Sequence, residues 1–240
     1  MKFAIFGDVH SNLEALNAVL EDARSHDCTH FVCIGDIVGY NANPSECLEV
    51  IQKLDCPVVK GNHDEEASLD TELVGLNPLA QKSMQWTRDN LDLNQKKYLK
   101  ELKLARHVGD FTIVHATLDS PASWGYVTSK FDALESLGYQ YTPVCFFGHT
   151  HVPAFYFKDL RMEEHQGKSI KIETGKKYQI NVGSVGQPRD GDFRSSYCIY
   201  DVDERLIINR RVGYDIKTAQ EKILKAGLPE QLAHRLAEGK

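Results

Sequence analysis

The 240-residue sequence has no long hydrophobic run and no excess of positive charge, and these absences exclude two classes of protein. No apolar run approaches the roughly 20 residues that a membrane-spanning helix needs. With 28 Lys and Arg against 34 Asp and Glu, the formal net charge is −6. Proteins that bind long nucleic acids usually carry an excess of positive charge, so this balance argues against such a partner. A composition of 42% hydrophobic and 26% charged residues is typical of an ordinary soluble globular protein.

Cysteine is present but follows no pattern of paired or metal-binding thiols. The six cysteines are scattered, no two form a Cys-x-x-Cys pair, and most have apolar neighbours. The first apolar stretch, 2–6, meets Gly7 and Asp8 too early for the apolar core of a signal peptide. We therefore expect reduced packing thiols, a buried first strand, a cytoplasmic protein and no membrane partner.

The first quarter of the chain alternates short apolar runs with helical periodicity. Apolar runs at 2–6, 30–34 and 57–59 each lead into a glycine, which is the pattern of buried strands that pass into loops. Between the first two runs, 11–26 has apolar residues at helical spacing, and a further helix candidate follows Pro44. This order predicts a βαβαβ unit with a parallel sheet.

The rest of the chain divides into a helical and a strand-rich segment. Residues 65–105 are rich in Leu, Lys, Gln, Asn and Glu, and we expect a helical insert or cap that overhangs the site. Strand patterns return at 111–115 and 143–147, with a helix candidate between them, and short alternating strands run from 152 to 212. Two weak helices close the chain. No linker interrupts this pattern, so we treat 1–240 as one domain.

Side chains of the metal-binding types follow the apolar runs. Seven donors stand at five such positions, namely Asp8, His10, Asp36, Asn62, His115, His149 and His151. Ligands of open α/β sheets gather at the carboxyl ends of the strands, where we expect these donors to meet. Asp8 and His10 are two residues apart, as are His149 and His151, so an extended backbone turns each pair to one side.

The donor set fits two borderline divalent ions. Mixed imidazole and oxygen donors suit Mn, Fe or Zn, and no cysteine is placed to add a thiolate. Seven donors are too many for one four-coordinate ion and suit two ions that share a carboxylate. Only two donors are anionic, so the centre retains positive charge and favours an anionic substrate such as a phosphate ester. Two metals about 3.5–4 Å apart lower the pKa of a bridging water and clamp an in-line displacement at phosphorus.

The motifs that carry these donors resemble the calcineurin-like metallophosphoesterase superfamily. The superfamily pattern is Gly-Asp-x-His, Gly-Asp-x-x, Gly-Asn-His-Asp/Glu, a lone His and Gly-His-x-His. In this chain the five elements stand in that order at 7–10, 35–38, 61–64, 115 and 148–151. A later segment, 181–189, resembles a small bacterial and archaeal branch of the superfamily. The resemblance implies an α/β fold, a four-layer α/β/β/α sandwich of two mixed sheets with a small helical insert.

The same resemblance implies a role for each residue of the motifs. It assigns one ion to Asp8, His10 and His151, the other to Asn62, His115 and His149, and a bridge to Asp36. It places His63 off the metals, where the imidazole contacts the phosphate or protonates the leaving oxygen after in-line attack by a metal-bridging hydroxide. Asp64 would orient His63, or form a purely structural ion pair. We expect both divalent ions to be manganese, with iron, zinc, nickel and magnesium as alternatives.

A departure from the superfamily pattern bears on the substrate. The Ser/Thr protein phosphatases of the superfamily continue the second motif into Asp-Arg-Gly, whereas this chain has Gly39 and Tyr40, so the arginine that binds phosphate is absent. Without that bidentate clamp we predict a small phosphodiester, which carries less charge than a monoester. The alternatives are a phosphomonoesterase, either a protein phosphatase or a dinucleoside polyphosphate hydrolase, and a non-catalytic scaffold.

Weaker candidates have two interpretations each. Arg189 would reach a substrate phosphate, or form a loop salt bridge with Asp190 or Asp192. Asn12 would touch the substrate, or cap the helix that follows it. Tyr126 would stack on a base or line the pocket, or pack in the core. The sequence indicates no oligomeric state.

Overall fold

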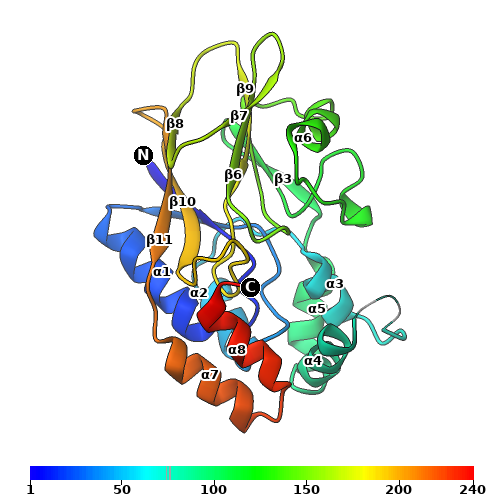
Figure 1. The fold of residues 1–240 in the computed structure, drawn as a ribbon. Helices are drawn as coiled ribbons and strands as arrows, with labels where there is room; N and C mark the ends of the chain where they lie inside the picture. Colours follow the sequence, from blue (N-terminus) through cyan, green and yellow to red (C-terminus); the bar gives the residue numbers. More distant parts are fainter. Residues whose placement is uncertain (74, 76) are drawn as a thin grey trace.

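The computed structural model describes residues 1–73, 75 and 77–240, and two β-sheets form its centre (Figure 1). The five-stranded sheet has, in spatial order, β2 (His30–Cys33), β1 (Lys2–Phe6), β10 (Ser195–Asp201), β11 (Leu206–Val212) and β8 (Ser169–Lys171). The six-stranded sheet has β3 (Ala105–Val108), β4 (Phe111–Val114), β5 (Val144–Phe147), β9 (Lys177–Asn181), β6 (Ala154–Lys158) and β7 (Met162–His165).

Both sheets combine parallel and antiparallel pairs. Strand β1 runs parallel to β2 and antiparallel to β10. Strand β5 runs parallel to β4 and β9, and β9 runs antiparallel to β6. The prediction of two mixed sheets is therefore confirmed.

Eight α-helices surround the sheets in the described part of the chain (Figure 1). They are α1 (Leu13–Ser25), α2 (Pro44–Lys53), α3 (Asn62–Ser68), α4 (Pro78–Asp89), α5 (Leu93–Glu101), α6 (Lys130–Leu137), α7 (Ile216–Lys225) and α8 (Glu230–Glu238). Helices α4 and α5 fall within 65–105, the segment for which the composition predicts helices. No helix of the described residues is both long and apolar enough to cross a membrane.

The alternation of side chains along each central strand produces four layers. In β1, Ile5 packs between the two sheets, whereas Phe6 packs among the residues of α1 and α2. In β5, Phe146 packs between the sheets, whereas Phe147 packs toward α6. Since successive strand residues point to opposite faces, each sheet is buried on both sides. Helices cover the outer faces, and the strand ends remain free to carry the site.

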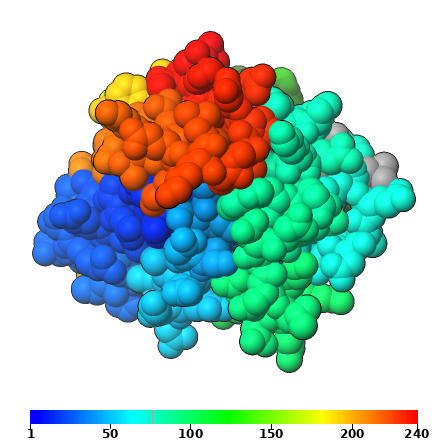
Figure 2. All heavy atoms as spheres, turned by 90° about the horizontal axis from the view of Figure 1, so that it is seen from below, coloured from blue at the N-terminus to red at the C-terminus, as the bar shows by residue number. Residues whose placement is uncertain are grey.

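The two C-terminal helices support the loop that follows β2. Helices α7 and α8 form a separate apolar cluster that includes Tyr40 of this loop and Ala80 of α4. Figure 2 shows the orange and red C-terminal helices beside the blue first helix and against the cyan and green segment that contains α4. The C-terminal pair therefore fixes one wall of the region above the strand ends.

The strand predictions were wrong at two places. Residues 57–59 form only two isolated bridges, Cys33 with Val58 and Val59 with Lys103, because Pro57 has no N–H to extend the ladder. Strand β3 was not predicted, because it is a partly exposed edge strand with polar residues. All six cysteines are free thiols, five of them buried.

Candidate metal centre

The seven predicted donors converge where the loops after β1, β2, β4 and β5 meet the first turn of α3. Two groups have ligand atoms within 4.8 Å of one another: Asp8, His10, Asp36 and His151 in the first, and Asp36, His115 and His149 in the second. All six of these side chains are buried. Asn62, the first residue of α3, lines the same cavity as three of them. Asp36 belongs to both groups, so the arrangement has the form of two adjoining sites.

The backbone at these positions is strained. Five donors have left-handed conformations, Asp8 (φ 48°), His10 (47°), Asp36 (50°), His149 (67°) and His151 (61°). Such conformations are uncommon outside glycine and cost about 1–3 kcal/mol each. They turn each side chain off the line of its strand and toward the common centre. Backbone strain at five candidate donors is typical of functional sites, where strained conformations position the functional side chains.

Each of the four histidines is anchored by a backbone carbonyl. In three rings the anchored atom is Nδ1: that of His10 lies 3.1 Å from the carbonyl oxygen of Val38, that of His115 lies 2.9 Å from that of Ile34, and that of His151 lies 2.6 Å from that of Gln187. In His149 the anchored atom is Nε2, which lies 3.0 Å from the carbonyl oxygen of Trp124. A carbonyl only accepts, so each anchored nitrogen carries the proton. The other nitrogen of each ring faces the cluster, as in metal-bound histidines whose orientation is set by an outer contact.

The facing nitrogens of His10 and His151 need a positive charge between them. Nε2 of His10 lies 3.0 Å from Nε2 of His151, and Nε2 of His115 lies 3.2 Å from Nδ1 of His149. Burial lowers the pKa of His10 and His151 well below the usual range, so both rings are neutral and two lone pairs face each other. The buried Oδ1 atoms of Asp8 and Asn62 also have no hydrogen-bond partner. These donors fit divalent cations.

The carboxylates create the field that attracts such cations. Burial raises the pKa of Asp8 to about 7. Burial opposes ionisation of Asp36 as well, yet the adjacent His115 and His63 hold its pKa well below its usual range. Burial would likewise lower the pKa of His115, but Asp36 and Asp8 raise it to about 9. The cluster thus draws positive charge to its centre. Burial lowers the pKa of His149 to about 3, which keeps that ring neutral as metal binding requires.

A cavity of about 180 Å³ opens above the cluster. Besides four of the donors, it is lined by His63, Tyr40, Gly75, Asn77, Ala80, Tyr126 and Arg189. The Tyr126 ring stacks on that of His149 with 4.2 Å between centroids and is 58% exposed, so it lines the cavity and does not pack in the core. Sequence reasoning did not find Asn77 and Ala80, because nothing in 65–105 indicates which residues reach the strand ends.

His63 lies at the edge of the cluster. Its ring centroid is 4.8 Å from that of His10 and 4.5 Å from that of Tyr40, and its backbone N–H donates to Asp36 Oδ1 at 2.8 Å. Its Nδ1 is buried without a hydrogen-bond partner. Gly39 allows this close approach, since a Cβ there would lie 2.5 Å from the His63 Nδ1 atom.

Asp64 and Asn12 lie beside the site but have other partners. Asp64 Oδ1 accepts from Ile37 N at 2.8 Å and Oδ2 accepts from Gly61 N at 3.0 Å. The carboxylate therefore holds two motif loops together, and the expected contact with His63 is not formed. Asn12 Oδ1 caps α1 through Ala15 N at 3.1 Å, and its Nδ2 donates to the Gly186 carbonyl at 3.0 Å. Its amide is buried and engaged on both sides.

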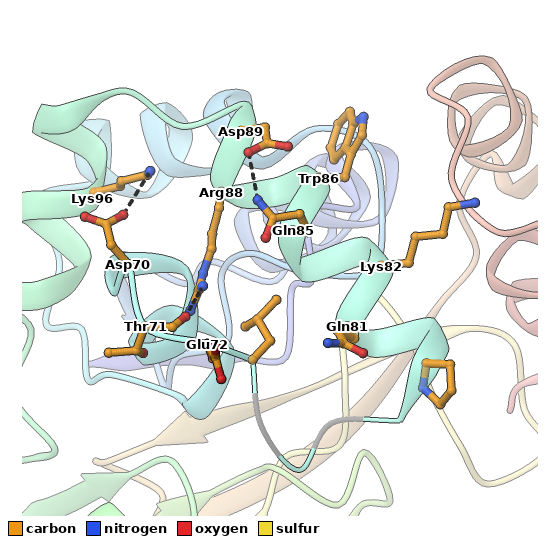
Figure 3. A pocket seen from close by; sticks show the side chains of 12 residues that line it. Asp70, Thr71, Glu72, Gln81, Lys82, Gln85, Trp86, Arg88, Asp89 and Lys96 are labelled. Carbon is orange, nitrogen blue, oxygen red and sulfur yellow. Dashed lines mark hydrogen bonds and ion pairs between the residues drawn. The ribbon is translucent and has the colours of Figure 1, made fainter.

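A larger cavity of about 1090 Å³ lies along α4, away from the donors (Figure 3). Several of its charged groups have protein partners: Lys96 pairs with Asp70 at 3.8 Å, and Arg88 donates to the Thr71 carbonyl at 2.6 Å. Figure 3 shows Gln85 directed at Asp89 in the same way, at 2.9 Å. Size alone would favour this cavity, but the convergent donors with unpartnered atoms belong to the smaller one.

Comparison with known proteins shows the family of this chain. The family model of the calcineurin-like phosphoesterase superfamily domain matches residues 1–205. An uncharacterized protein of Methanocaldococcus jannaschii is 40% identical over 241 residues, which cover 99% of this chain and 98% of that protein.

Solved structures give the same result. The crystal structure of a metallophosphoesterase from Sphaerobacter thermophilus is 38% identical, has a TM-score of 0.89, and covers 100% of this chain and 99% of its own. A hypothetical protein of Pyrococcus horikoshii, at 17% identity, a TM-score of 0.82 and coverage of 100% and 98%, shares the fold.

Proposed function

Since the chain belongs to the calcineurin-like phosphoesterase superfamily, we propose that it is a metal-dependent hydrolase of small phosphate esters. The observation that carries the proposal is the buried cluster in which four imidazoles and two carboxyl groups surround a common centre. A scaffold protein would have no reason to retain strained backbone at five donors and facing lone pairs. We treat 1–240 as a single domain in which 65–105 acts as a cap over the cavity.

We assign the donors to two divalent ions. Asp8, His10 and His151 would hold the first, Asn62, His115 and His149 the second, and Asp36 would contact both. The two groups of buried ligand atoms that share Asp36 support this division. Nitrogen and oxygen donors suit manganese, with iron, zinc, nickel and magnesium as alternatives.

The chain's own residues supply the remaining chemistry. Two divalent ions, when bound, provide a hydroxide at neutral pH and stabilise charge on the phosphoryl oxygens. His63 lines the cavity next to Asp36 and would donate a proton to the leaving oxygen. Tyr40 packs against the His63 ring and limits its rotation. Asn77, the N-cap residue of α4, and Ala80 of α4 line the cavity, and its small volume favours a small substrate.

Two ester classes compete for this cavity. The prediction of a phosphodiester depends on the absence of an arginine at position 40. Arg189 lines the cavity and supplies a guanidinium from another loop, which favours the phosphomonoesterase alternative. The experiment below therefore tests both a monoester and a diester.

The proposal is tested by hydrolysis of p-nitrophenyl phosphate and bis(p-nitrophenyl) phosphate with metal-stripped protein and added Mn²⁺. We expect Mn²⁺-dependent hydrolysis of at least one ester. In His63→Ala we expect turnover to fall about 10²- to 10⁴-fold while bound Mn²⁺ is retained, the usual scale of acid–base assistance. His234→Ala, at an exposed histidine of α8, is the control. Wild-type turnover in His63→Ala with metal bound would refute the assigned role.

A further inference from the structure

The loop that follows β9 is fastened to two loops that carry metal-ligand candidates. Gly186 N donates to the Asp8 carbonyl at 2.9 Å, and the Gln187 carbonyl accepts from the His151 ring at 2.6 Å. Arg189 N donates to the His151 carbonyl at 3.2 Å. The backbone position of Arg189 is thus fixed relative to the donor cluster by direct hydrogen bonds.

The charge of Arg189 is not neutralised by an ion pair with any described residue. Its two acidic neighbours in the sequence have other partners, since Asp190 pairs with Arg211 and Asp192 pairs with Arg194 at 2.6 Å. The Arg189 guanidinium instead donates from Nε and Nη2 to the Oε1 atom of Gln187, at 3.2 and 2.9 Å. A neutral amide orients the guanidinium and leaves its charge available to an anion.

The guanidinium lies against Tyr40, the side chain at the position where the Ser/Thr protein phosphatases of the superfamily have an arginine. Arg189 Cζ is 5.7 Å from the centroid of the Tyr40 ring, and Tyr40 occupies the position of the arginine in the Asp-Arg-Gly continuation. The Tyr40 ring in turn contacts those of His63 and His10, at 4.5 and 4.7 Å between centroids. Arg189 and Tyr40 both line the 180 Å³ cavity with the donors.

We propose that Arg189 binds the terminal oxygens of a dianionic phosphomonoester, in place of the arginine that the second motif lacks. Tyr40 is the platform that holds its guanidinium, and Gln187 sets its rotation. A planar guanidinium binds two oxygens at once, and a monoester offers three terminal oxygens and two charges where a diester offers two oxygens and one charge. This inference rests on the proposed phosphoesterase function and names its substrate class.

The test compares Arg189→Gln with Arg194→Gln, a more exposed arginine of the same loop whose partner is Asp192. For Mn²⁺-loaded protein we expect Arg189→Gln to lower kcat/KM for p-nitrophenyl phosphate about 10- to 100-fold, and to lower that for bis(p-nitrophenyl) phosphate less than about threefold. In calorimetric titrations, inorganic phosphate should bind about 10-fold or more weakly, whereas dimethyl phosphate should bind unchanged. Arg194→Gln should leave all four values unchanged.

The alternative outcomes separate this inference from the proposed function. Equal losses on both esters, unchanged phosphate binding, or loss of bound Mn²⁺ in Arg189→Gln would overturn the assignment of Arg189. Arg189→Lys, which keeps the charge without the planar fork, should recover part of the monoester selectivity and guards against a folding defect. If the wild type hydrolyses neither ester, the proposed function fails, and the titration with inorganic phosphate still decides whether Arg189 binds the anion.

Discussion

Replacement of Gly148 by alanine tests the packing that holds Asp8 in the cluster. A Cβ at Gly148 would lie 2.3 Å from Asp8 Oδ2 and 3.0 Å from Cδ1 of Ile34. The Asp8 Oδ2 atom also accepts a hydrogen bond from His149 N at 3.1 Å. The carboxylate therefore has to move, and the movement breaks a buried hydrogen bond.

The expected loss of stability in Gly148→Ala comes from overpacking against Asp8, and it should shrink when the Asp8 carboxylate is removed. Forcing an extra methyl group into a packed site costs about 1–3 kcal/mol, which for a chain of this length corresponds to a fall in Tm of about 2–12 °C. In an Asp8→Ala background the clashing oxygen is gone, and only the flexible end of Ile34 remains in close contact. There Gly148→Ala should cost less than about 1 kcal/mol, so the two changes should couple by about 0.5–2 kcal/mol.

The assay is thermal and urea unfolding of the metal-free wild type, both single variants and the double variant. Gly213→Ala is the control, because nothing lies within 4 Å of a Cβ built at that position. It should shift the free energy of unfolding by less than about 1 kcal/mol in either background. If Gly148→Ala costs the same with and without the Asp8 carboxylate, the steric argument is refuted.

Two further predictions concern residues outside the donor set. Gly39 has a φ of +94°, and a Cβ at this position would lie 2.5 Å from His63 Nδ1. In Gly39→Ala, turnover should therefore fall at least about 10-fold while the Mn²⁺ content stays constant. Loss of bound Mn²⁺ in this variant would count against the reasoning. The pKa of Asp22 is lowered despite burial, because Arg210 and Tyr197 donate hydrogen bonds to it. Its stabilising contribution is therefore present above a pH of about 4 and lost as pH falls through the lowered pKa. Asp22→Asn should lower the free energy of unfolding at pH 7 by up to about 1 kcal/mol, and urea unfolding at pH 3 should show a smaller difference.

The candidate donors could be picked out from the sequence because they stand in local motifs that follow apolar runs. A buried run ends at Gly7 or Gly35, and the next residue is a carboxylate at the carboxyl end of its strand. The ends of β1 and β2 in one sheet lie near those of β4 and β5 in the other, so motifs recognised locally in the sequence come from segments that converge in the fold.

The sequence could not show which of several possible partners, far apart in the chain, a polar side chain would contact. Asp64 was expected to orient His63, but the backbone amides of Ile37 and Gly61 were closer competitors for the carboxylate. Edge strands such as β3 were missed because an exposed strand needs no apolar alternation. The fate of the charge on Arg189 depended on Arg211 of β11, which pairs with Asp190. No local pattern reports such a pairing.

The loop after β9 connects a metal-ligand candidate, His151, with the guanidinium that we propose to bind the anion. The Gln187 carbonyl anchors the His151 ring, while the Gln187 side chain orients Arg189. Gly186 is required at the start of this segment, since a Cβ there would lie 1.9 Å from the Val9 carbonyl oxygen. A change in the loop backbone therefore disturbs a metal-ligand candidate and the guanidinium together, whereas a change confined to the Arg189 side chain leaves the anchor of His151 intact. Side-chain variants are for this reason the ones that can separate anion selectivity from metal content.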